Sequence, residues 1–320
     1  FAKGTSSRAT KLVHGGVRYL EQGNIALVRE ALRERGILLR NAPHLVKNTS
    51  FIIPNYTRLA GFIYPIGLKL YDLLAGGRSF GVSRFISKSE VISRLPNIKQ
   101  EGLRSGVLYH DGQFDDARLA VNLAQTCLEQ GGIVLNYMRV TGLIKDHRRI
   151  TGVIAEDVET GTAYHIKSRS VINATGVFAD EILKLENESA KSIIRPSQGV
   201  HLVLDYSFLQ SKDAIMIPHT DDGRVLFAIP WQHNVLVGTT DTPLNAHSLE
   251  PRALENEVDF ILKTATKYLT KAPKRADVLS VFAGLRPLAA TDDTKEKTKE
   301  ISRSHKVIVS DSGLVSVIGG

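Results

Sequence analysis

The 320 residues include 42% hydrophobic and 23% charged side chains, a composition that excludes a disordered chain and is typical of a globular protein. A chain of this length can bury a large core and is expected to form two structural units. The single cysteine, Cys127, excludes a disulfide framework and suits a reducing cytosol. The net charge of +8 favours anionic partners, although a simple surface excess of Lys and Arg explains it equally well.

The first part of the chain alternates glycine-rich polar stretches with apolar helical patterns. Residues Ile25 to Leu39 repeat apolar side chains at helical spacing, which predicts an amphipathic helix ending near Pro43. The segment Leu59 to Gly77 is apolar but is broken by Pro65, Lys69 and Asp72. It is too interrupted to span a bilayer, so a buried helix pair around the proline is favoured over a segment in a membrane interface.

The middle of the chain predicts an α/β unit. Asp115 to Gly132 forms a helix with two aspartates at its start, and Ile133 to Val140 follows as a strand. Val153 to Val158 and Ala163 to Lys167 alternate as a hairpin. Cys127 is expected to be buried by the helical periodicity of its own segment. The stretch "SVINATG", Ser170 to Gly176, then predicts a short buried strand that ends on a glycine before a helix, the place where open α/β sheets bind ligands.

From Arg195 to Leu288 the pattern changes to short β-rich runs separated by turn residues, which predicts an antiparallel sheet. One helix, Leu254 to Leu269, interrupts it. A charged stretch, "ATDDTKEKTKEISRSHK", is interpreted as solvated surface, and two short strands in "VIVSDSGLVSVIGG" close the sequence.

Several common sites are absent from the sequence. It contains no G-x-G-x-x-G loop, no Walker A loop, no G-x-S-x-G elbow and no His/Cys spacing typical of a metal site. No basic run is interleaved with aromatic residues, so nucleic acid is not an expected partner. The first residues are Phe-Ala-Lys-Gly, with no signal peptide and no initiator methionine, and the chain is therefore expected to be an internal fragment.

A set of motifs resembles the FAD-dependent glycerol-3-phosphate dehydrogenase/oxidase family. These are "TSSRATKLVHGGVRYLEQGN", "LVREALRERGILLRNAPHLV", "DDARL", "VINATGVFAD", "IPW", "GTTDTPL", "GLRPL" and the final "SVIGG", in the order of the family and across essentially the whole chain. The family's N-terminal strand with its G-x-G-x-x-G helix is not found before Phe1, and its C-terminal domain is not found after Gly320.

The resemblance implies an α/β (α+β) fold: a Rossmann-like FAD/NAD(P)-binding domain with an inserted antiparallel sheet that forms a substrate-binding cap, truncated at both ends. The expected cofactor-binding domain is discontinuous and comprises residues 1–50, 100–185 and 303–320. The expected cap domain comprises residues 51–99 and 186–302.

The resemblance also implies the residues that bind FAD. One group would line the flavin and its linker, and ordinary helix capping is the alternative role for its hydroxyl side chains: Thr5, Ser6, Ser7, Thr10, Lys11, Leu12, His14, Gly15 and Gly16. A second group would contact the adenosine part of the cofactor: Val140, Asn173, Ala174, Thr175 and Gly176. No metal ligands are expected.

For catalysis, the resemblance implies a histidine that takes the proton of the substrate hydroxyl. Histidine suits this role because its ordinary pKa is near 6.5. His14 and His201 are both candidates, and the alternative for each is a structural hydrogen bond. Arg18, Arg286 and Arg303 would bind the substrate phosphate, with Tyr19 adding a hydroxyl, because guanidinium groups match phosphate oxygens. Thr239, Thr240 and Asp241 are expected near the same site, although a simple turn explains them almost as well.

The expected reaction is oxidation of glycerol 3-phosphate to dihydroxyacetone phosphate by hydride transfer to FAD, with electrons passed to quinone. The alternatives left open are an oxidase that uses oxygen, a related amino-acid or glycine oxidase, and a non-catalytic protein that binds nucleic acid or anionic lipid. The expected location is cytoplasmic, with peripheral contact to the inner face of the membrane. A homodimer is also left open.

Overall fold

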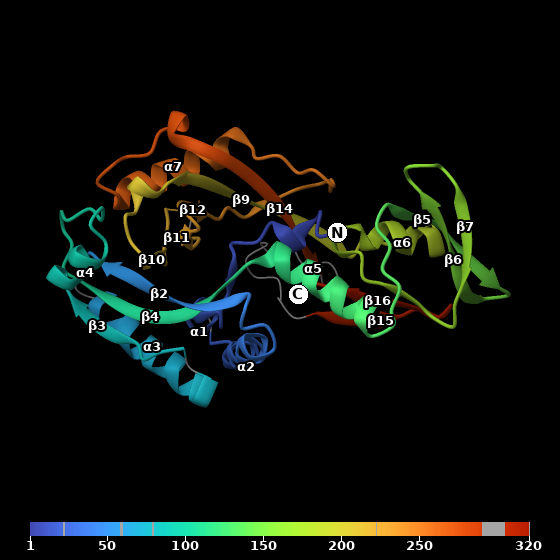
Figure 1. Cartoon of the computed structure of the whole chain (residues 1–320), viewed down its shortest axis with the longest axis horizontal. Helices are drawn as coiled ribbons and strands as arrows, with labels where there is room; N and C mark the ends of the chain where they lie inside the picture. Colours follow the sequence, from blue (N-terminus) through green and yellow to red (C-terminus); the bar gives the residue numbers. More distant parts are fainter. Residues whose placement is uncertain (22, 58–59, 79, 222, 290–304, 320) are drawn as a thin grey trace.

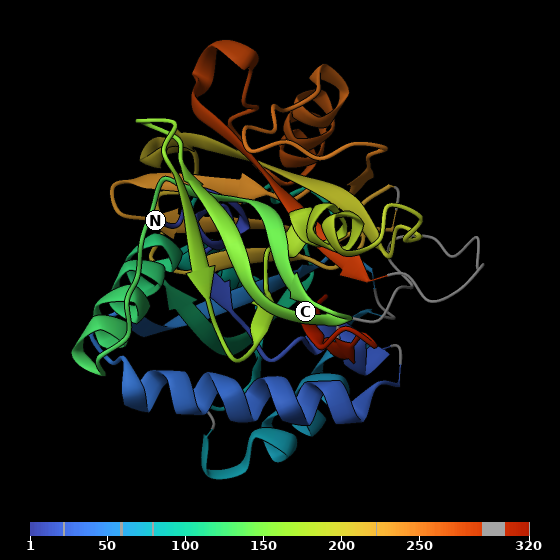
Figure 2. The same cartoon turned by 90° about the vertical axis from the view of Figure 1, so that its right-hand side faces the viewer.

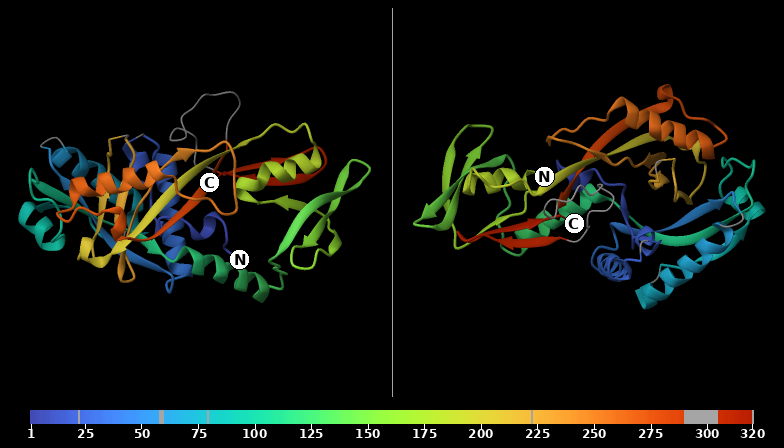
Figure 3. Two further views of the ribbon diagram at one scale, coloured as in Figure 1. Left: turned by 90° about the horizontal axis from the view of Figure 1, so that it is seen from above. Right: turned by 180° about the vertical axis from the view of Figure 1, so that it is seen from behind.

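The computed structural model describes residues 1–21, 23–57, 60–78, 80–221, 223–289 and 305–319. The molecule is elongated (Figure 1), with a large sheet at one end and two small sheets at the other. The two further views in Figure 3 show the small sheets projecting from the body that contains the large one.

The large sheet has ten strands among the described residues. Its main path is β1 (Leu12–Val13), β4 (Ser105–Phe114), β2 (Val46–Asn55), β10 (Ala214–Ile217), β11 (Leu226–Trp231), β12 (Asn234–Gly238), β9 (Ile194–Asp205) and β13 (Thr242–Pro243), while β3 (Arg84–Ser87) pairs with β4 and β14 (Val278–Ala289) pairs with β9. All pairs are antiparallel except β2 with β10. The antiparallel sheet predicted from the sequence is thus confirmed.

The two small sheets have three strands each. One contains β15 (Lys306–Val309), β16 (Leu314–Ile318) and β8 (Val171–Asn173), with β8 parallel to β16. The other is an antiparallel meander of β5 (Met138–Asp146), β6 (Arg149–Asp157) and β7 (Ala163–Lys167). The predicted hairpin corresponds to β6 and β7.

Seven α-helices lie within the described residues: α1 (Val17–Glu21), α2 (Ile25–Asn41), α3 (Ala60–Ala75), α4 (Lys88–Arg94), α5 (Asp116–Glu129), α6 (Ala179–Glu186) and α7 (Glu255–Tyr268). The side chain of Asn24 accepts a hydrogen bond from Leu27 N at the start of α2, and that of Asp115 accepts one from Arg118 N at the start of α5. These caps satisfy backbone donors that a helix leaves open. The predicted helices in these regions and at α7 are confirmed.

Helices cover both faces of the large sheet (Figure 2), with α2 on one side and α7 on the other. Side chains of a strand alternate between faces, so β2 presents Phe51 and Ile53 to α2 and α3 and presents Ile52 to the cluster that includes α7. Both faces are buried, which explains why the central strands read as continuous apolar runs.

The large sheet continues into the smaller end of the molecule through β9 and β14. Ile194 and Ala289, at paired ends of these strands, pack with Ala179 of α6 and Ile318 of β16 in a small buried cluster. The two strands therefore belong to the large sheet and also fix its position relative to the small mixed sheet of β8, β15 and β16.

Three local predictions are wrong. The segment Leu59 to Gly77 was expected to form a helix pair, but its described part contains one helix, α3, with Tyr71 buried and Leu73 76% exposed. The strand expected at Ile133 to Val140 begins only at Met138, because Met138 and the residues after it pair with the antiparallel β6, not with a parallel neighbour. Cys127 is exposed on α5, since the apolar spacing of that helix does not turn the thiol inward.

The sheets bear on the proposed division into domains. β4 lies within the segment assigned to the cofactor-binding unit, yet it pairs along its length with β2 in the large sheet. The division into a cofactor-binding unit of residues 1–50, 100–185 and 303–320 and a cap of residues 51–99 and 186–302 stays a proposal. Residues 105–114, assigned to the first unit, pair with strands of the large sheet.

None of the helices in the described parts of the chain combines the length and the apolar character that crossing a bilayer requires.

Removing a buried side chain of β9 tests the two-faced core. Leu202 is fully buried in β9, so Leu202→Ala is expected to lower the free energy of unfolding by about 2–5 kcal/mol, since it leaves a cavity. Leu279 on the adjacent β14 is 61% exposed, and Leu279→Ala serves as the control, with an expected change of about 0.5 kcal/mol or less. Equal effects in urea unfolding would contradict the described packing.

Candidate active site

The N-terminal segment that precedes α1 is held between the large sheet and α5. The hydroxyl of Thr5 donates to the carbonyl of Leu285 at 2.6 Å, which attaches the segment to β14. Lys11 Nζ lies 2.6 Å from Asp116 Oδ1, and the other oxygen of this buried carboxylate accepts from Ala9 N. Charge pairing and backbone hydrogen bonds thus fix the course of the segment up to Leu12.

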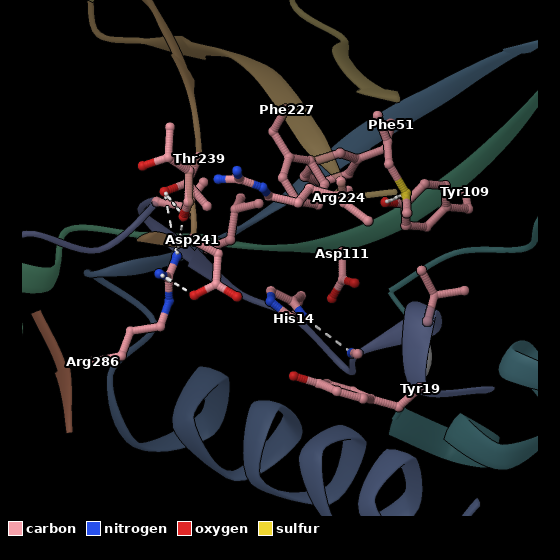
Figure 4. Close-up of a pocket in the computed structure, with 17 residues that line it drawn as sticks. His14, Tyr19, Phe51, Tyr109, Asp111, Arg224, Phe227, Thr239, Asp241 and Arg286 are labelled. Carbon is pink, nitrogen blue, oxygen red and sulfur yellow. Dashed lines mark hydrogen bonds and ion pairs between the residues drawn. The ribbon is translucent and has the colours of Figure 1, made fainter. Parts of the chain in front are cut away.

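The segment then lines a cavity of about 220 Å³ between the large sheet and α1 (Figure 4). Of the residues predicted for the site, Thr10, Leu12, His14, Gly16, Tyr19, Arg286 and the turn Thr239 to Asp241 line it. The other lining residues are Val17, Phe51, Tyr109, Asp111, Met216, Arg224, Val225 and Phe227. The cavity therefore has an apolar floor and a few convergent polar groups, which is typical of a small-molecule site.

His14 is exposed to this cavity and its ring has a defined tautomer. The backbone N–H of Gly16 donates to His14 Nδ1 at 3.0 Å. Because an amide nitrogen only donates, Nδ1 must be the unprotonated nitrogen, and the neutral ring carries its proton on Nε2. Neutral His14 is consequently arranged to donate a hydrogen bond from Nε2, and it can accept a proton only at the cost of the bond from Gly16.

His201 lies on β9 and is buried; it is not among the residues that line the cavity. Its Nε2 lies 2.9 Å from the hydroxyl oxygen of Thr10, which does line the cavity, and its ring stacks on Phe282 of β14. Burial, followed by the positive charges of Arg286 and Lys11, lowers the pKa of His201 to about 3. The ring is therefore neutral at physiological pH, and its hydrogen bond with Thr10 connects it to a residue that lines the cavity.

Arg286 lies on β14, and its guanidinium is held by the turn that follows β12. Nη2 donates to the carbonyl of Thr240 at 3.0 Å, and Nη1 donates to Asp241 Oδ1 at 3.3 Å. A Cβ atom on Gly199 of the neighbouring strand would lie 2.7 Å from Nη2 of Arg286, so the space for this guanidinium requires glycine. Arg286 thus presents a fixed positive group to the cavity (Figure 4).

Asp111, in the middle of β4, connects the His14 loop to two helices. Its Oδ1 accepts from Arg35 Nη1 of α2 at 2.7 Å and from Gly15 N at 3.3 Å, and its Oδ2 accepts from the Tyr71 hydroxyl of α3 at 2.8 Å. Arg35, Tyr71 and Asp111 are each at most 2% exposed. Both oxygens of this buried carboxylate accept hydrogen bonds, which offsets part of the cost of burying its charge. The loop that carries His14 is therefore fixed to a buried charge.

Sequence analysis missed two charged residues of the cavity. Arg224 precedes β11, and its stretch "RVLFAIPW" was interpreted only as a strand; its guanidinium also lies over the Phe260 ring at 4.9 Å. Asp111 could have been found, because it follows the apolar run Val107 to Tyr109 within a strand, and a buried carboxylate needs a partner.

The remaining predicted residues fall elsewhere. Asn173, Ala174, Thr175 and Gly176 lie at the carboxyl end of the parallel strand β8, where Asn173 Nδ2 donates to the Ala179 carbonyl. Val140 lies on β5 in the other small sheet. Thr5, Ser6, Ser7, Lys11 and Gly15 belong to the N-terminal segment but do not line the cavity. Arg18 lies on α1 without a described side chain, and Arg303 lies outside the described residues.

Within the described ranges, no group of three or more His, Cys, Asp or Glu residues is arranged to hold a metal ion.

The environment of His201 predicts a loss of stability in acid. Its pKa is about 3 in the folded state and near 6.5 in the unfolded chain, so between these values only the unfolded chain binds the proton. The stability that the neutral His201 contributes to the folded state is complete above pH 6.5 and is lost as the pH falls toward 3. Relative to His201→Gln, which does not titrate, the wild-type free energy of unfolding is expected to fall by about 2 kcal/mol from pH 7 to pH 5. If the difference in the free energy of unfolding between the wild type and His201→Gln does not change with pH, the environment assigned to His201 is contradicted.

Comparison with known proteins gives a consistent assignment. A family model described as FAD dependent oxidoreductase matches residues 1–317. The glycerol-3-phosphate dehydrogenases named mitochondrial from Schizosaccharomyces pombe and Homo sapiens are 40% and 39% identical over the whole of this chain, which covers 53% and 46% of their lengths. The chain spans about half the length of these curated relatives.

Solved structures agree with the sequence relatives. The glycerol-3-phosphate dehydrogenase of Bacillus halodurans complexed with FAD matches with a TM-score of 0.78 and 32% identity, over 100% of this chain and 54% of the other. A glycine oxidase from Bacillus cereus, at 16% identity and a TM-score of 0.66 over 100% of this chain and 80% of the other, shares the fold. The chain belongs to the family of FAD dependent oxidoreductases.

Proposed function

We propose that this chain forms the catalytic part of an FAD-dependent glycerol-3-phosphate dehydrogenase. The observation that supports this proposal most directly is the cavity that combines His14 with Arg286 and Arg224. Two guanidinium groups suit a small anionic substrate, and His14 Nε2 suits an oxygen on its carbon chain. Relatives at about 40% identity named glycerol-3-phosphate dehydrogenase support the same substrate.

The residues at the end of β8 fit a dinucleotide cofactor. Gly176 has a φ of +61°, and a Cβ atom there would meet no other atom within 4 Å, so its backbone is open to a close neighbour. Ala174 and Thr175 are exposed beside it, at the carboxyl end of a parallel strand pair. We infer that this turn holds the adenosine part of FAD and that Thr10 and Gly16 lie near its flavin. When bound, FAD accepts the hydride from C2 of the substrate.

In this proposal two histidines act on the substrate hydroxyl, one as a hydrogen-bond donor and the other as the proton acceptor. His14 would orient the C2 oxygen by donating from Nε2. The proton would leave through the hydroxyl of Thr10 to His201 Nε2, 2.9 Å away. Phosphate bound at Arg286 would oppose one of the positive charges that lower the pKa of His201, and this would make the ring a better proton acceptor.

The other candidate functions have weaker support. The Mycoplasma pneumoniae glycerophosphate oxidase is 15% identical, and the glycine oxidases are 16–18% identical, so these similarities concern the fold. The dehydrogenase is favoured because the relatives at 38–41% identity carry that name. A non-catalytic anion-binding role leaves the ordered surroundings of His14 unexplained.

The acceptor, the location and the assembly are also proposals. Quinone as electron acceptor is supported by the dehydrogenase names of the relatives, several of which are named mitochondrial. That adjective favours an organelle over the cytoplasmic location expected from the sequence. Contact with a membrane surface is supported by the exposed Leu70 and Leu73 on α3. A homodimer has no supporting contact in the described chain.

An anaerobic spectrum of the full-length protein tests the reaction. Addition of glycerol 3-phosphate is expected to bleach the visible absorption of bound FAD, because the hydride is transferred to it. Glycerol alone, which lacks the phosphate, serves as the control and is expected to bleach it far more slowly. A flavin spectrum that is indifferent to glycerol 3-phosphate would contradict the proposal.

Substitution of Arg286 tests the phosphate site. Arg286→Ala in the full-length protein is expected to raise the KM for glycerol 3-phosphate at least about 10-fold, since a charged hydrogen bond contributes about 1.5–3 kcal/mol. Inorganic phosphate should lose its competitive inhibition to the same degree. Arg275→Ala removes an exposed arginine paired with Glu255 and Asp259, and is expected to leave the KM unchanged. An unchanged KM in Arg286→Ala would contradict the assigned role.

A further inference from the structure

Glu257, in the first turn of α7, is a buried carboxylate with four neutral donors. Glu257 is only 3% exposed. Oε1 accepts from the hydroxyls of Thr240 at 2.9 Å and Thr242 at 2.6 Å, and Oε2 accepts from Gln198 Nε2 at 2.7 Å and from Leu254 N at 2.9 Å. Among the described residues, no Lys or Arg pairs with it. A buried charge is costly unless every oxygen is bonded, so this arrangement tolerates little displacement.

Two of these donors belong to the turn at residues 239–242, which forms one wall of the cavity. The Thr240 hydroxyl donates to Glu257 and accepts from Val200 N at 2.9 Å, so its single proton is committed to the carboxylate. Thr240 is 1% exposed. The turn is therefore fixed between α7 and β9 by bonds that converge on one carboxylate.

The opposite side of the same turn holds Arg286. Its guanidinium donates to the carbonyl of Thr240, to Asp241 Oδ1 and, at 3.4 Å, to Thr239 Oγ1. Asp241 is further held by the hydroxyl of Ser197. Every one of these acceptors moves with the turn, so the orientation of Arg286 depends on the bonds that Glu257 makes behind it.

We propose that Glu257 is a positioning residue that fixes the turn at residues 239–242 and thereby orients Arg286 toward the anionic group of the substrate. The inference rests on the proposed function, in which Arg286 binds phosphate. Glu257 does not line the cavity. It acts through Thr240 and Thr242.

The sign of the expected effect separates this role from the alternatives. As a distant negative charge alone, Glu257 would repel phosphate, and its removal would tighten phosphate binding. As a helix cap alone, through Leu254 N, its removal would lower stability and leave phosphate binding unchanged. The positioning role predicts weaker phosphate binding although a negative charge is removed.

The test measures inhibition by inorganic phosphate and the KM for glycerol 3-phosphate in the full-length enzyme that carries Glu257→Gln. Both constants are expected to rise by the same factor, about 10-fold, because the amide cannot accept from all four donors. Glu255→Gln is the matched control, since Glu255 lies in the same helical turn but pairs with the exposed Arg275. Its inhibition constant for phosphate is expected to match that of the wild type.

A second pair of variants keeps the charge and covers the case in which Glu257→Gln fails to fold. Thr242→Val removes one donor to Glu257, and a smaller rise of both constants, about 3-fold, is expected. Thr242→Ser retains the hydroxyl and is expected to restore the wild-type values. Unchanged or tighter phosphate inhibition in Thr242→Val, or in folded Glu257→Gln, overturns the inference.

The Arg286→Ala variant distinguishes this failure from that of the proposed function. If Arg286→Ala weakens phosphate binding and the Glu257 and Thr242 variants do not, the positioning role is wrong and the phosphate site remains. If Arg286→Ala also has no effect, Arg286 does not bind phosphate, so that part of the proposed function is wrong and the inference fails with it.

Discussion

The ladder between β9 and β14 is the interaction on which the rest of the structure depends. It runs from Ile194 opposite Ala289, beside the small sheet of β8, β15 and β16, to Leu204 opposite Val278, at the far end of the large sheet. A shift of one residue would turn every side chain of β14 to the other face, because successive side chains alternate. The register thus decides at once where the core lies and where Arg286 points.

Several groups of the site are consequences of this register. Phe282 lies opposite His201 and stacks on its ring, while Arg286 lies opposite Ser197, whose hydroxyl holds Asp241. The N-terminal segment adds to the same ladder through the bond from Thr5 to Leu285. One pair of strands therefore supports a histidine, an arginine and the chain that leads to His14.

Three buried carboxylates support the cavity: Asp111 lines it, whereas Asp116 and Glu257 lie outside its lining. Asp116 fixes the N-terminal segment through Lys11, Asp111 fixes the loop of His14 through Gly15, and Glu257 fixes the turn beside Arg286. All three accept backbone N–H groups as well as side-chain donors. Buried charges of this kind add little net stability but demand a defined geometry, which suits a site that must hold polar groups in place.

The sequence by itself determined most of the helices and strands and, by resemblance, the residue types of the candidate site. Helical spacing predicts α2 and, with the two aspartates at its start, α5, because these signals are local. The alternating runs after Arg195 predict the antiparallel sheet, with the helix α7 between them. The motif around His14 and the arginine in "GLRPL" indicate the site residues by resemblance. Only the tertiary structure decided which neighbour each strand has. The strand expected to begin at Ile133 begins at Met138, and Cys127 is exposed.

Only the tertiary structure also decided the state of each polar group. The low pKa of His201 and the buried, hydrogen-bonded position of Glu257 depend on contacts between residues from 17 to 191 positions apart in the chain. Periodicity reports which face of an element is apolar, but it does not report what lies across from that face. The role of a histidine or a carboxylate is set by those distant partners, so the residue types are visible in the sequence and their chemistry is fixed by packing.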